Sequence, residues 1–467
     1  MPSLVDAINQ GPAGLFSLVW WFFTQSFGWV ILFIGFDVMI VWMYLLWIRN
    51  MARKHKNYIL LAVDVPLENE QNPKAIENLF QHFTGAHQTF GIYDKWWSGE
   101  VHDSFSLEIV SIGGYIQFVI YTRDIYRDLI ESVFYAQYPD ARITEIEDYT
   151  KKWNIRFPSD QYDMWGTEIV MKKPQYYPIK TFEDFIDKAS NEFKDPMASM
   201  LEGLSKIGPG EEIWIQLVIT PADNDWGEDA ESLIQKLIGG KAHSKSSFLD
   251  ILIFKPIQFL SSIISEGLNP AAATSTSKRG DDAPNKILYL TPGQTDTVAA
   301  IERKIGKLGF HTRIRTVYVA PKQSFKRKLG LKVIYGSFKQ FNSLSLNALK
   351  LNSRTYPGGL VWFADWRENW RRNLIFSEFK DRGHSLNPGE YGKIMSSEEL
   401  ASIYHFPVKE VKAPQLKTIE SRRAEPPIEL PTSIFAETQA SPAEKSASTE
   451  EMAQPEDAGP PENLPVV

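Results

Sequence analysis

The sequence contains no cysteine. Disulfide bonds, thiol nucleophiles, and zinc or iron–sulfur sites built on cysteine are therefore excluded, and a chain without cysteine suits the reducing cytoplasm. Three catalytic signatures are also missing: a phosphate-binding GxxxxGK[ST] loop, an HExxH motif and a GxSxG turn. Gly239-Gly-Lys241 lacks the first glycine and the hydroxyl residue of such a loop. His82, His87 and His102 are scattered over a helix end and a tryptophan-rich loop. We therefore expect no enzyme activity, no cofactor and no metal.

Lysine and arginine are absent from the first 48 residues. Within the apolar stretch from Phe27 to Ile48, the only ionisable residue is Asp37. About 20 apolar residues in a helix cross a bilayer core of roughly 30 Å. The basic residues Arg49, Arg53 and Lys54 follow at once, and positive flanks stay on the cytoplasmic side. The sequence predicts a single transmembrane helix over 27–48, with residues 1–26 outside the cell or at the outer interface.

Two alternatives concern this N-terminal stretch. A cleaved signal peptide would need a basic first region and a small-residue cleavage site, and neither is present. Residues 15–23 are also apolar and could lie along the outer interface or form a second, short span. Inserting the carboxylate of Asp37 near the middle of the span costs at least about 2.5 kcal/mol of free energy. It indicates either a contact between protomers or a relay, or a carboxyl group that one long apolar helix tolerates.

The region 57–150 alternates between strand and helix patterns. Apolar runs at 58–65, 105–111, 115–121 and 141–146 predict strands, and helical spacing follows Pro73 and Asp124. The two middle strands are joined at Gly113-Gly114, which is typical of a hairpin. The resulting βαββαβ order is that of a ferredoxin-like unit.

The same order is expected again over 163–320, with strands at 167–171, 212–219, 287–290 and 311–319 and a helical insertion at 222–285. Residues 248–264 of the insertion are apolar and predict a helix that either packs on a neighbour or lies on the membrane. Residues 321–410 have a mixed α/β pattern, and 425–467 have a disordered composition. The predicted fold class is α+β: a transmembrane helix, two ferredoxin-like units, the second with the insertion, and a disordered tail.

The formal net charge is −7, so the chain as a whole is no general polyanion binder. Between residues 303 and 354, however, basic residues are dense, acids are almost absent, and aromatic residues alternate with the charges. Such a block could bind nucleic acid or anionic lipid, or it could be a solvated face that balances acidic regions elsewhere. The candidate polyanion-binding residues are Arg303, Lys304, Lys307, Arg313, Arg315, Lys322, Lys326, Arg327 and Lys328.

Several phrases between about Arg49 and Pro431 carry a resemblance. They include KNYILLAVDVPLENEQNPKAIENLFQHFTGAH, SLEIVSIGGYIQFVIYT, DPMASMLEGLSKIGPGEEIWIQLVITPA and SEELASIYHFP. This part of the chain resembles the membrane-anchored N-terminal half of type IV secretion and conjugation coupling ATPases of candidate-phyla bacteria. None of the phrases is a catalytic signature. In that family an ATPase domain with a Walker loop would follow ESRRAEPPIELP, whereas here the sequence continues SIFAETQASPAEKSASTEE.

The resemblance implies a relative without a motor domain. We therefore expect a single-pass protein of the cell membrane, with its N-terminus outside and its C-terminus in the cytoplasm, that acts as an adaptor or scaffold in a type IV secretion-like or DNA-transfer machine. Its expected partners are the cytoplasmic membrane, further copies of itself, and possible binding partners such as a separate ATPase subunit or nucleic acid. The alternative is a membrane-tethered module that binds anionic lipid or nucleic acid and is unrelated to secretion.

Overall fold

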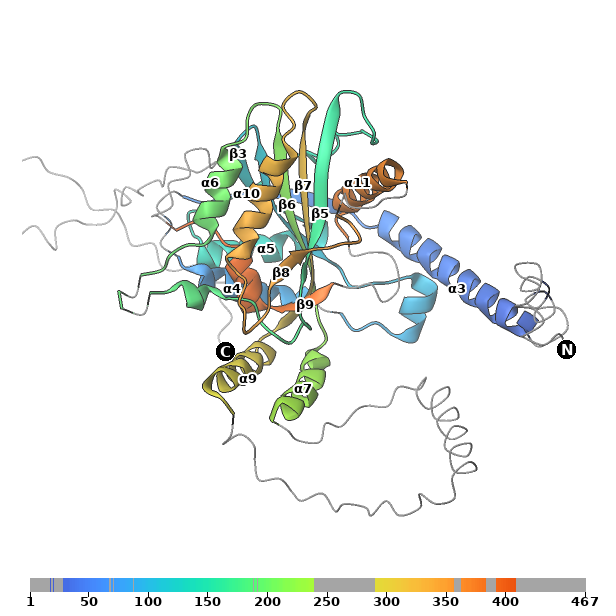
Figure 1. Ribbon diagram of the computed structural model, residues 1–467, viewed down its shortest axis with the longest axis horizontal. Helices are drawn as coiled ribbons and strands as arrows, with labels where there is room; N and C mark the ends of the chain where they lie inside the picture. The colour runs from blue at the N-terminus through green and yellow to red at the C-terminus, as the bar shows by residue number, and fades with distance from the viewer. Residues whose placement is uncertain are drawn as a thin grey trace, which may run out of the picture. The chain divides into compact units, whose positions relative to one another are not determined.

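The computed structural model describes residues 28–66, 69, 71–86, 88–187, 189–190, 192–238, 290–356, 363–383 and 392–408, together with Ser17 and Trp20. Within these residues the frame is one antiparallel sheet of nine strands, with helices on both faces (Figure 1). The strands are β1 Tyr58–Asp64, β2 Phe105–Ile112, β3 Tyr115–Arg123, β4 Arg142–Glu145, β5 Tyr162–Met171, β6 Glu212–Pro221, β7 Gly309–Pro321, β8 Leu349–Leu351 and β9 Lys393–Ser396.

The strand order is β4-β1-β3-β2-β6-β7-β5-β8, and β9 pairs with β7. β7 has two partners on one edge because of its length: its first residues pair with β9 and its later ones with β5. The hairpin between β2 and β3 turns at Gly113 and Gly114, which have φ angles of +59° and +94°. Glycine adopts such angles without a steric penalty, and the predicted hairpin is confirmed.

Five helices cover one face of the sheet: α4 (Pro73–Phe83), α5 (Arg127–Gln137), α6 (Met197–Ser205), α10 (Arg327–Lys339) and α12 (Ser397–Ile403). Their apolar residues recur at helical spacing, and they bury Phe80, Phe105 and Phe310 in the main core. Short helical turns connect the elements: η1 Thr84–Ala86, η2 Asp94–Ser98, η3 Asp124–Tyr126, η4 Phe182–Phe185 and η5 Asn224–Gly227.

A single helix among the described elements, α11 (Ala364–Asp381), packs on the other face of the sheet. Its Phe376 and Phe379 lie against Trp214 of β6, with ring centroids 6.1 and 5.4 Å apart. Since successive strand residues point to opposite faces, Ile213 and Ile215 enter the main core while Trp214 enters this smaller one. β6 is therefore buried on both sides.

Three further helices lie outside these two layers. α7 (Glu228–Ile238) and α9 (Pro292–Ile305) pack on each other through Ala230, Ile234, Val298 and Ile301. α3 (Gly28–Lys54) extends away from the sheet (Figure 1). It is the only helix in the described part of the chain that is long and apolar enough to cross a membrane, over Phe33–Lys54.

The predicted fold class of two ferredoxin-like units is wrong. Residues 57–150 have the predicted order of elements, but β2 pairs with β6 from Phe105 opposite Ile219 to Ile112 opposite Glu212. The strands of 57–150 and 163–320 thus belong to one sheet. Residues 321–410 join it too, because β8 pairs with β5 and β9 with β7. Periodicity identifies strands, but it does not say which strands are neighbours.

Several other expectations fall wholly or partly outside the described residues. These are the segment 1–26 except Ser17 and Trp20, most of the insertion with its apolar stretch 248–264, the strand residues 287–289, and the tail 425–467. Within the described part, η4 and α6 are two separate elements. They are separated by the segment that contains Asp195 and Pro196.

Candidate functional site

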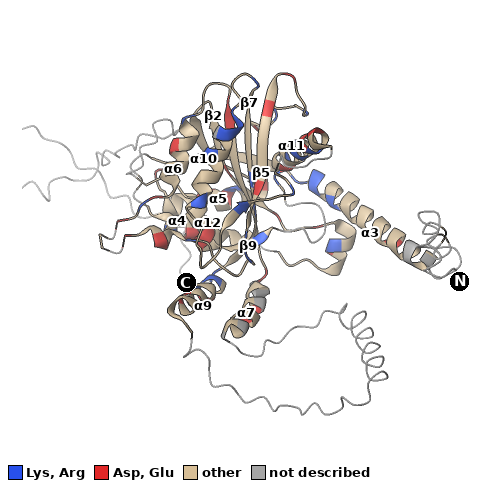
Figure 2. Cartoon of the chain, in the orientation of Figure 1, with Lys and Arg blue, Asp and Glu red and all other residues tan. Residues whose placement is uncertain are grey.

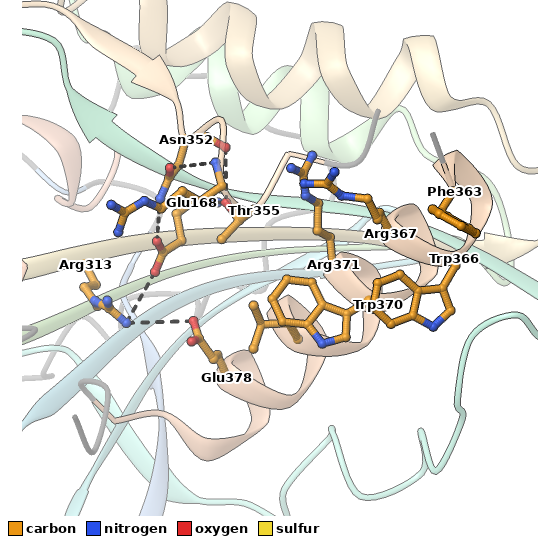
Figure 3. A pocket seen from close by; sticks show the side chains of 12 residues that line it. Glu168, Arg313, Asn352, Thr355, Phe363, Trp366, Arg367, Trp370, Arg371 and Glu378 are labelled. Atoms are coloured by element: carbon orange, nitrogen blue, oxygen red, sulfur yellow. Dashed lines mark hydrogen bonds and ion pairs between the residues drawn. The ribbon is translucent and has the colours of Figure 1, made fainter. Parts of the chain in front are cut away.

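A cleft of about 990 Å³ lies between α11 and the sheet (Figure 3). One wall is formed by a face of α11, together with Phe363 just before the helix. The floor comes from β5 and β7, and the opposite wall from the chain after β8. The lining residues are Glu168, Arg313, Asn352, Arg354, Thr355, Phe363, Trp366, Arg367, Trp370, Arg371, Leu374 and Glu378.

The floor of the cleft is part of a cluster of two arginines and two glutamates, in which Glu378 comes from α11 and Arg315 is buried beside the lining residues. Arg313 lies 3.6 Å from Glu168 and 3.8 Å from Glu378, and Arg315 lies 3.7 and 3.6 Å from the same carboxylates. Asn352 donates a hydrogen bond to Glu168 at 3.0 Å. Burial lowers the pKa of Arg315, and Glu378 and Glu168 offset this effect only in part. The charges of this floor are thus largely satisfied by one another.

The walls of the cleft differ from its floor. Phe363, Trp366 and Trp370 are 78, 69 and 53% exposed, and Figure 3 shows the two indole rings side by side along α11. Arg354 and Arg367 are also exposed, and within the described part of the chain neither guanidinium group has a carboxylate partner. The cleft therefore presents flat aromatic surfaces next to uncompensated positive charge.

The side chains of this cleft can bind a ligand that carries negative charge and planar rings. Aromatic faces stack on planar rings, and guanidinium groups bind phosphate or carboxylate oxygens. Among the described residues there is no group of three or more histidine, aspartate or glutamate side chains that could hold a metal ion. The cleft offers an anionic ligand both contact area and charge.

The basic residues predicted as a polyanion site do not form one surface. On and just after α9, Lys307 lies 2.7 Å from Glu77, and Arg303 lies 2.6 Å from Glu398. Lys304 is buried 2.7 Å from Glu399, and burial lowers its pKa although the carboxylate opposes this shift. These three charges are compensated by carboxylates from other elements.

The remaining predicted residues divide between the cleft and α10. Arg313 lines the cleft floor, and Arg315 is buried next to it. Arg327 lies 3.3 Å from Glu368 and 5.8 Å from the ring centre of Tyr356. Exposed side chains remain at three positions around the start of α10. These three are Lys322, Lys326 and Lys328.

Asp37 lies on α3 and is exposed, as are the apolar side chains around it. The single chain thus leaves this carboxyl group on the surface of the predicted span. Basic residues gather at the end of α3 nearest the sheet (Figure 2), as the sequence leads one to expect for Arg49, Arg53 and Lys54.

A buried polar network fastens α11 to the sheet directly after the cleft. Arg382 has a left-handed backbone with φ +49° and donates to Glu108 at 2.8 Å and twice to Asp148 at 2.6 and 2.9 Å. Gln216 donates to Glu108 at 2.9 Å and accepts from Arg315 at 3.1 Å. The network therefore continues into the floor of the cleft.

The fold and the site together define an α+β protein with one wide antiparallel sheet, an exposed apolar N-terminal helix and an aromatic, basic cleft. The chain belongs to the family described as "Domain of unknown function (DUF8128)", whose model matches residues 52–418. No curated protein matches the chain.

One solved structure with some similarity is a variant of berberine bridge enzyme, described in its title as "a reticuline dehydrogenase". It is 10% identical in sequence, the match covers 78% of this chain and 56% of that one, and the TM-score is 0.22. At this score the likeness supports no statement about the fold or the activity of this chain.

Proposed function

We propose that this protein is a single-pass membrane protein whose folded domain lies in the cytoplasm, and that it is a non-ATPase scaffold of a type IV secretion-like or DNA-transfer machine. The observation that carries the proposal is the exposure of α3. Most of the described large apolar side chains between Trp29 and Trp47 are 37 to 63% exposed. Among the described positions, Leu45 is buried and a few others are half-buried. A helix with this surface is stable in lipid and prone to association in water.

The attachment of α3 supports a scaffold. α3 ends at Lys54 and β1 begins at Tyr58, so the connection is short. Arg53 donates a hydrogen bond to the carbonyl oxygen of Asp381 at the end of α11. A helix fixed in this way holds the sheet close to the bilayer instead of tethering it on a long linker.

The assignment to a secretion or transfer machine is supported by the sequence phrases between Arg49 and Pro431. A scaffold in such a machine needs copies of itself and a separate ATPase. Asp37, exposed in the span, is the residue we expect at a contact between copies, because a carboxyl group in lipid is stabilised by a polar partner.

The absence of cysteine makes the topology directly testable. Leu344→Cys places one thiol at a fully exposed position of the folded domain. We expect the protein to stay in the membrane during alkaline extraction and its thiol to react with a membrane-impermeant maleimide in inverted vesicles but not in intact cells. Release by alkali, or labelling in intact cells, would contradict the proposal.

The partners are tested by chemical crosslinking in native membranes, followed by affinity purification and mass spectrometry. We expect a crosslinked homo-oligomer and an ATPase with a Walker loop. Asp37→Asn tests the contact in the span, and the neighbouring Met39→Leu is its matched control. Recovery of the monomer alone, without an ATPase, would count against the scaffold.

A second candidate function is favoured by the cleft beside α11: binding of an anionic ligand with planar rings, as in nucleic acid, or of anionic lipid. Replacing Trp370 by alanine is expected to weaken binding of a single-stranded oligonucleotide by about 1–3 kcal/mol. Arg367→Gln is expected to reduce the salt dependence of binding, whereas Arg142→Gln on β4 is expected to change nothing. Fluorescence anisotropy measures both, and phosphatidylglycerol vesicles replace the oligonucleotide in the lipid arm.

A further inference from the structure

A loop between α4 and β2, residues 88–100, carries a dense set of exposed aromatic and apolar side chains; we call it the aromatic loop. Ile92, Tyr93, Trp96 and Trp97 are 82, 67, 44 and 66% exposed. Tyr93 and Trp97 stack with ring centroids 6.2 Å apart and planes 11° from parallel. Side chains of this kind on a short segment mark a surface that contacts another phase or molecule.

The aromatic loop is held against α3. Gly99, with φ +68°, lies so close to the helix that a Cβ atom at this position would be 2.8 Å from the carbonyl of Ile48. Leu45, one turn before Ile48 on the same side of α3, is only 8% exposed. Lys56, just beyond α3, lies 2.8 Å from Glu100. These contacts fix the loop beside the last turns of the apolar part of α3.

The position of these contacts along α3 indicates which region of the bilayer the loop would contact. The apolar stretch ends at Ile48 and Arg49 follows, so this point lies where the hydrocarbon core gives way to the headgroups in the proposed span. With a rise of about 1.5 Å per residue, Leu45 lies roughly 6 Å deeper than Arg49. Tryptophan and tyrosine are enriched at this level of a bilayer, because their rings have an apolar body and a polar tip.

We propose that the aromatic loop inserts into the headgroup region of the cytoplasmic leaflet and forms a second membrane contact beside α3. The inference rests on the proposed membrane span. Lys95, exposed within the same loop, can reach lipid phosphates while the aromatic rings contact the acyl boundary. With two contacts, the folded domain has a fixed rotation and tilt relative to the bilayer, which one helix alone leaves undetermined.

Single-cysteine variants of the full-length protein test this inference. Trp97→Cys reports on the loop, Met39→Cys on α3, and Tyr115→Cys is the matched control. Tyr115 is 70% exposed and lies at the end of the β2–β3 hairpin remote from the loop. Each thiol is labelled with a polarity-sensitive fluorophore in vesicles of phosphatidylcholine and phosphatidylglycerol. Quenching by aqueous iodide is then compared with quenching by lipids spin-labelled near the headgroup or deep in the acyl chain.

We expect the label at 97 to emit at shorter wavelength than the label at 115. It should be quenched several-fold more by shallow spin-labelled lipid, whereas iodide should quench mainly the label at 115. Iodide quenching at 97 equal to that at 115, with position 39 quenched by deep lipid, overturns the inference and leaves the span intact. A label at 97 shielded from both quenchers means that protein covers the loop, which also overturns it. A label at 39 open to iodide refutes the span itself. Tyr93→Cys repeats the measurement with a second loop residue.

Discussion

Arg382, directly after α11, links this helix to Glu108 of β2 and to Asp148. It ends α11, is 2% exposed, and neutralises Glu108, which is fully buried in β2. Its guanidinium carbon also lies 4.8 Å from the ring centre of Tyr121 and 5.3 Å from that of Tyr149. Burial alone lowers the pKa of Arg382, but the attraction of Glu108 and Asp148 outweighs it, so the net pKa is raised and the residue stays charged.

Replacing Arg382 by methionine is expected to lower the free energy of unfolding by about 3–5 kcal/mol, because Glu108 would remain buried without a cation. Arg382→Lys is expected to fall between this variant and the wild type, since lysine cannot form the two parallel bonds to Asp148. Urea unfolding of the purified protein, followed by tryptophan fluorescence, measures the loss. The exposed Arg142→Met is the control. Equal stability of Arg382→Met and wild type would show that the network contributes little.

Asp148 gives this network a pH dependence. Burial raises its pKa, but the hydrogen bonds and charge of Arg382 outweigh burial, so the pKa is lowered in the folded state. The unfolded value is about 3.9. The stabilising contribution is therefore present above this value and is lost as the pH falls through the lower, folded pKa. We expect Asp148→Asn to be less stable than wild type at pH 7 and to lose less stability as the pH is lowered from about 5 to about 3, as read from urea midpoints. Parallel curves would exclude this role.

At the level of elements, the aromatic loop and α3 form a joint that depends on one glycine. Gly99 needs both its positive φ and the space that a side chain would fill. Gly99→Ala is expected to separate the loop from Ile48 and to speed amide hydrogen exchange in residues 88–100. Gly85→Ala, where nothing lies within 4 Å, is the control. Unchanged exchange in the first variant would mean that the joint does not depend on this contact.

The elements also show how much of the fold local sequence signals can predict. The apolar stretch of α3 and the β2–β3 hairpin are local signals, and the structure confirms them as a helix and a hairpin. The sequence does not predict α11, because its many charged residues and tryptophans interrupt the apolar periodicity. The signal that could have found it is its buried residues Ile375, Phe376 and Phe379, at helical spacing.

The candidate site could not be predicted from the sequence, for a different physical reason. Glu168, Asn352 and Trp370 come from segments far apart in sequence, and only the pairing of β5 with β7 and β8 brings their surroundings together. The basic block has the same limitation, because the carboxylates opposite Arg303, Lys304 and Lys307 lie on α4, η4 and α12. A run of charge in sequence does not show which charges are already paired.

At the scale of the whole molecule, the join between β2 and β6 decides the architecture. Every residue of β6 and all but the last of β2 are buried, so either strand at a sheet edge would expose apolar side chains and unpaired backbone groups. Full burial over both faces is typical of central strands, and in the sequence the run EIWIQLVITP carried this signal. The main core accordingly contains residues from both halves.

One sheet with a shared core predicts that both halves lose their structure together. Ile109→Ala removes a fully buried side chain of β2 opposite Ile215 of β6 and is expected to cost about 2–5 kcal/mol. In hydrogen exchange at increasing urea, peptides covering β3 and β7 should lose protection at the same concentration, and the variant should shift both to lower urea by the same amount. If the two halves were separate units, only the β3 peptide would shift to lower urea. The β7 peptide would keep its midpoint, because Ile109 would then make no contact with the half that contains β7. A shift of both peptides therefore measures the joint between β2 and β6 itself.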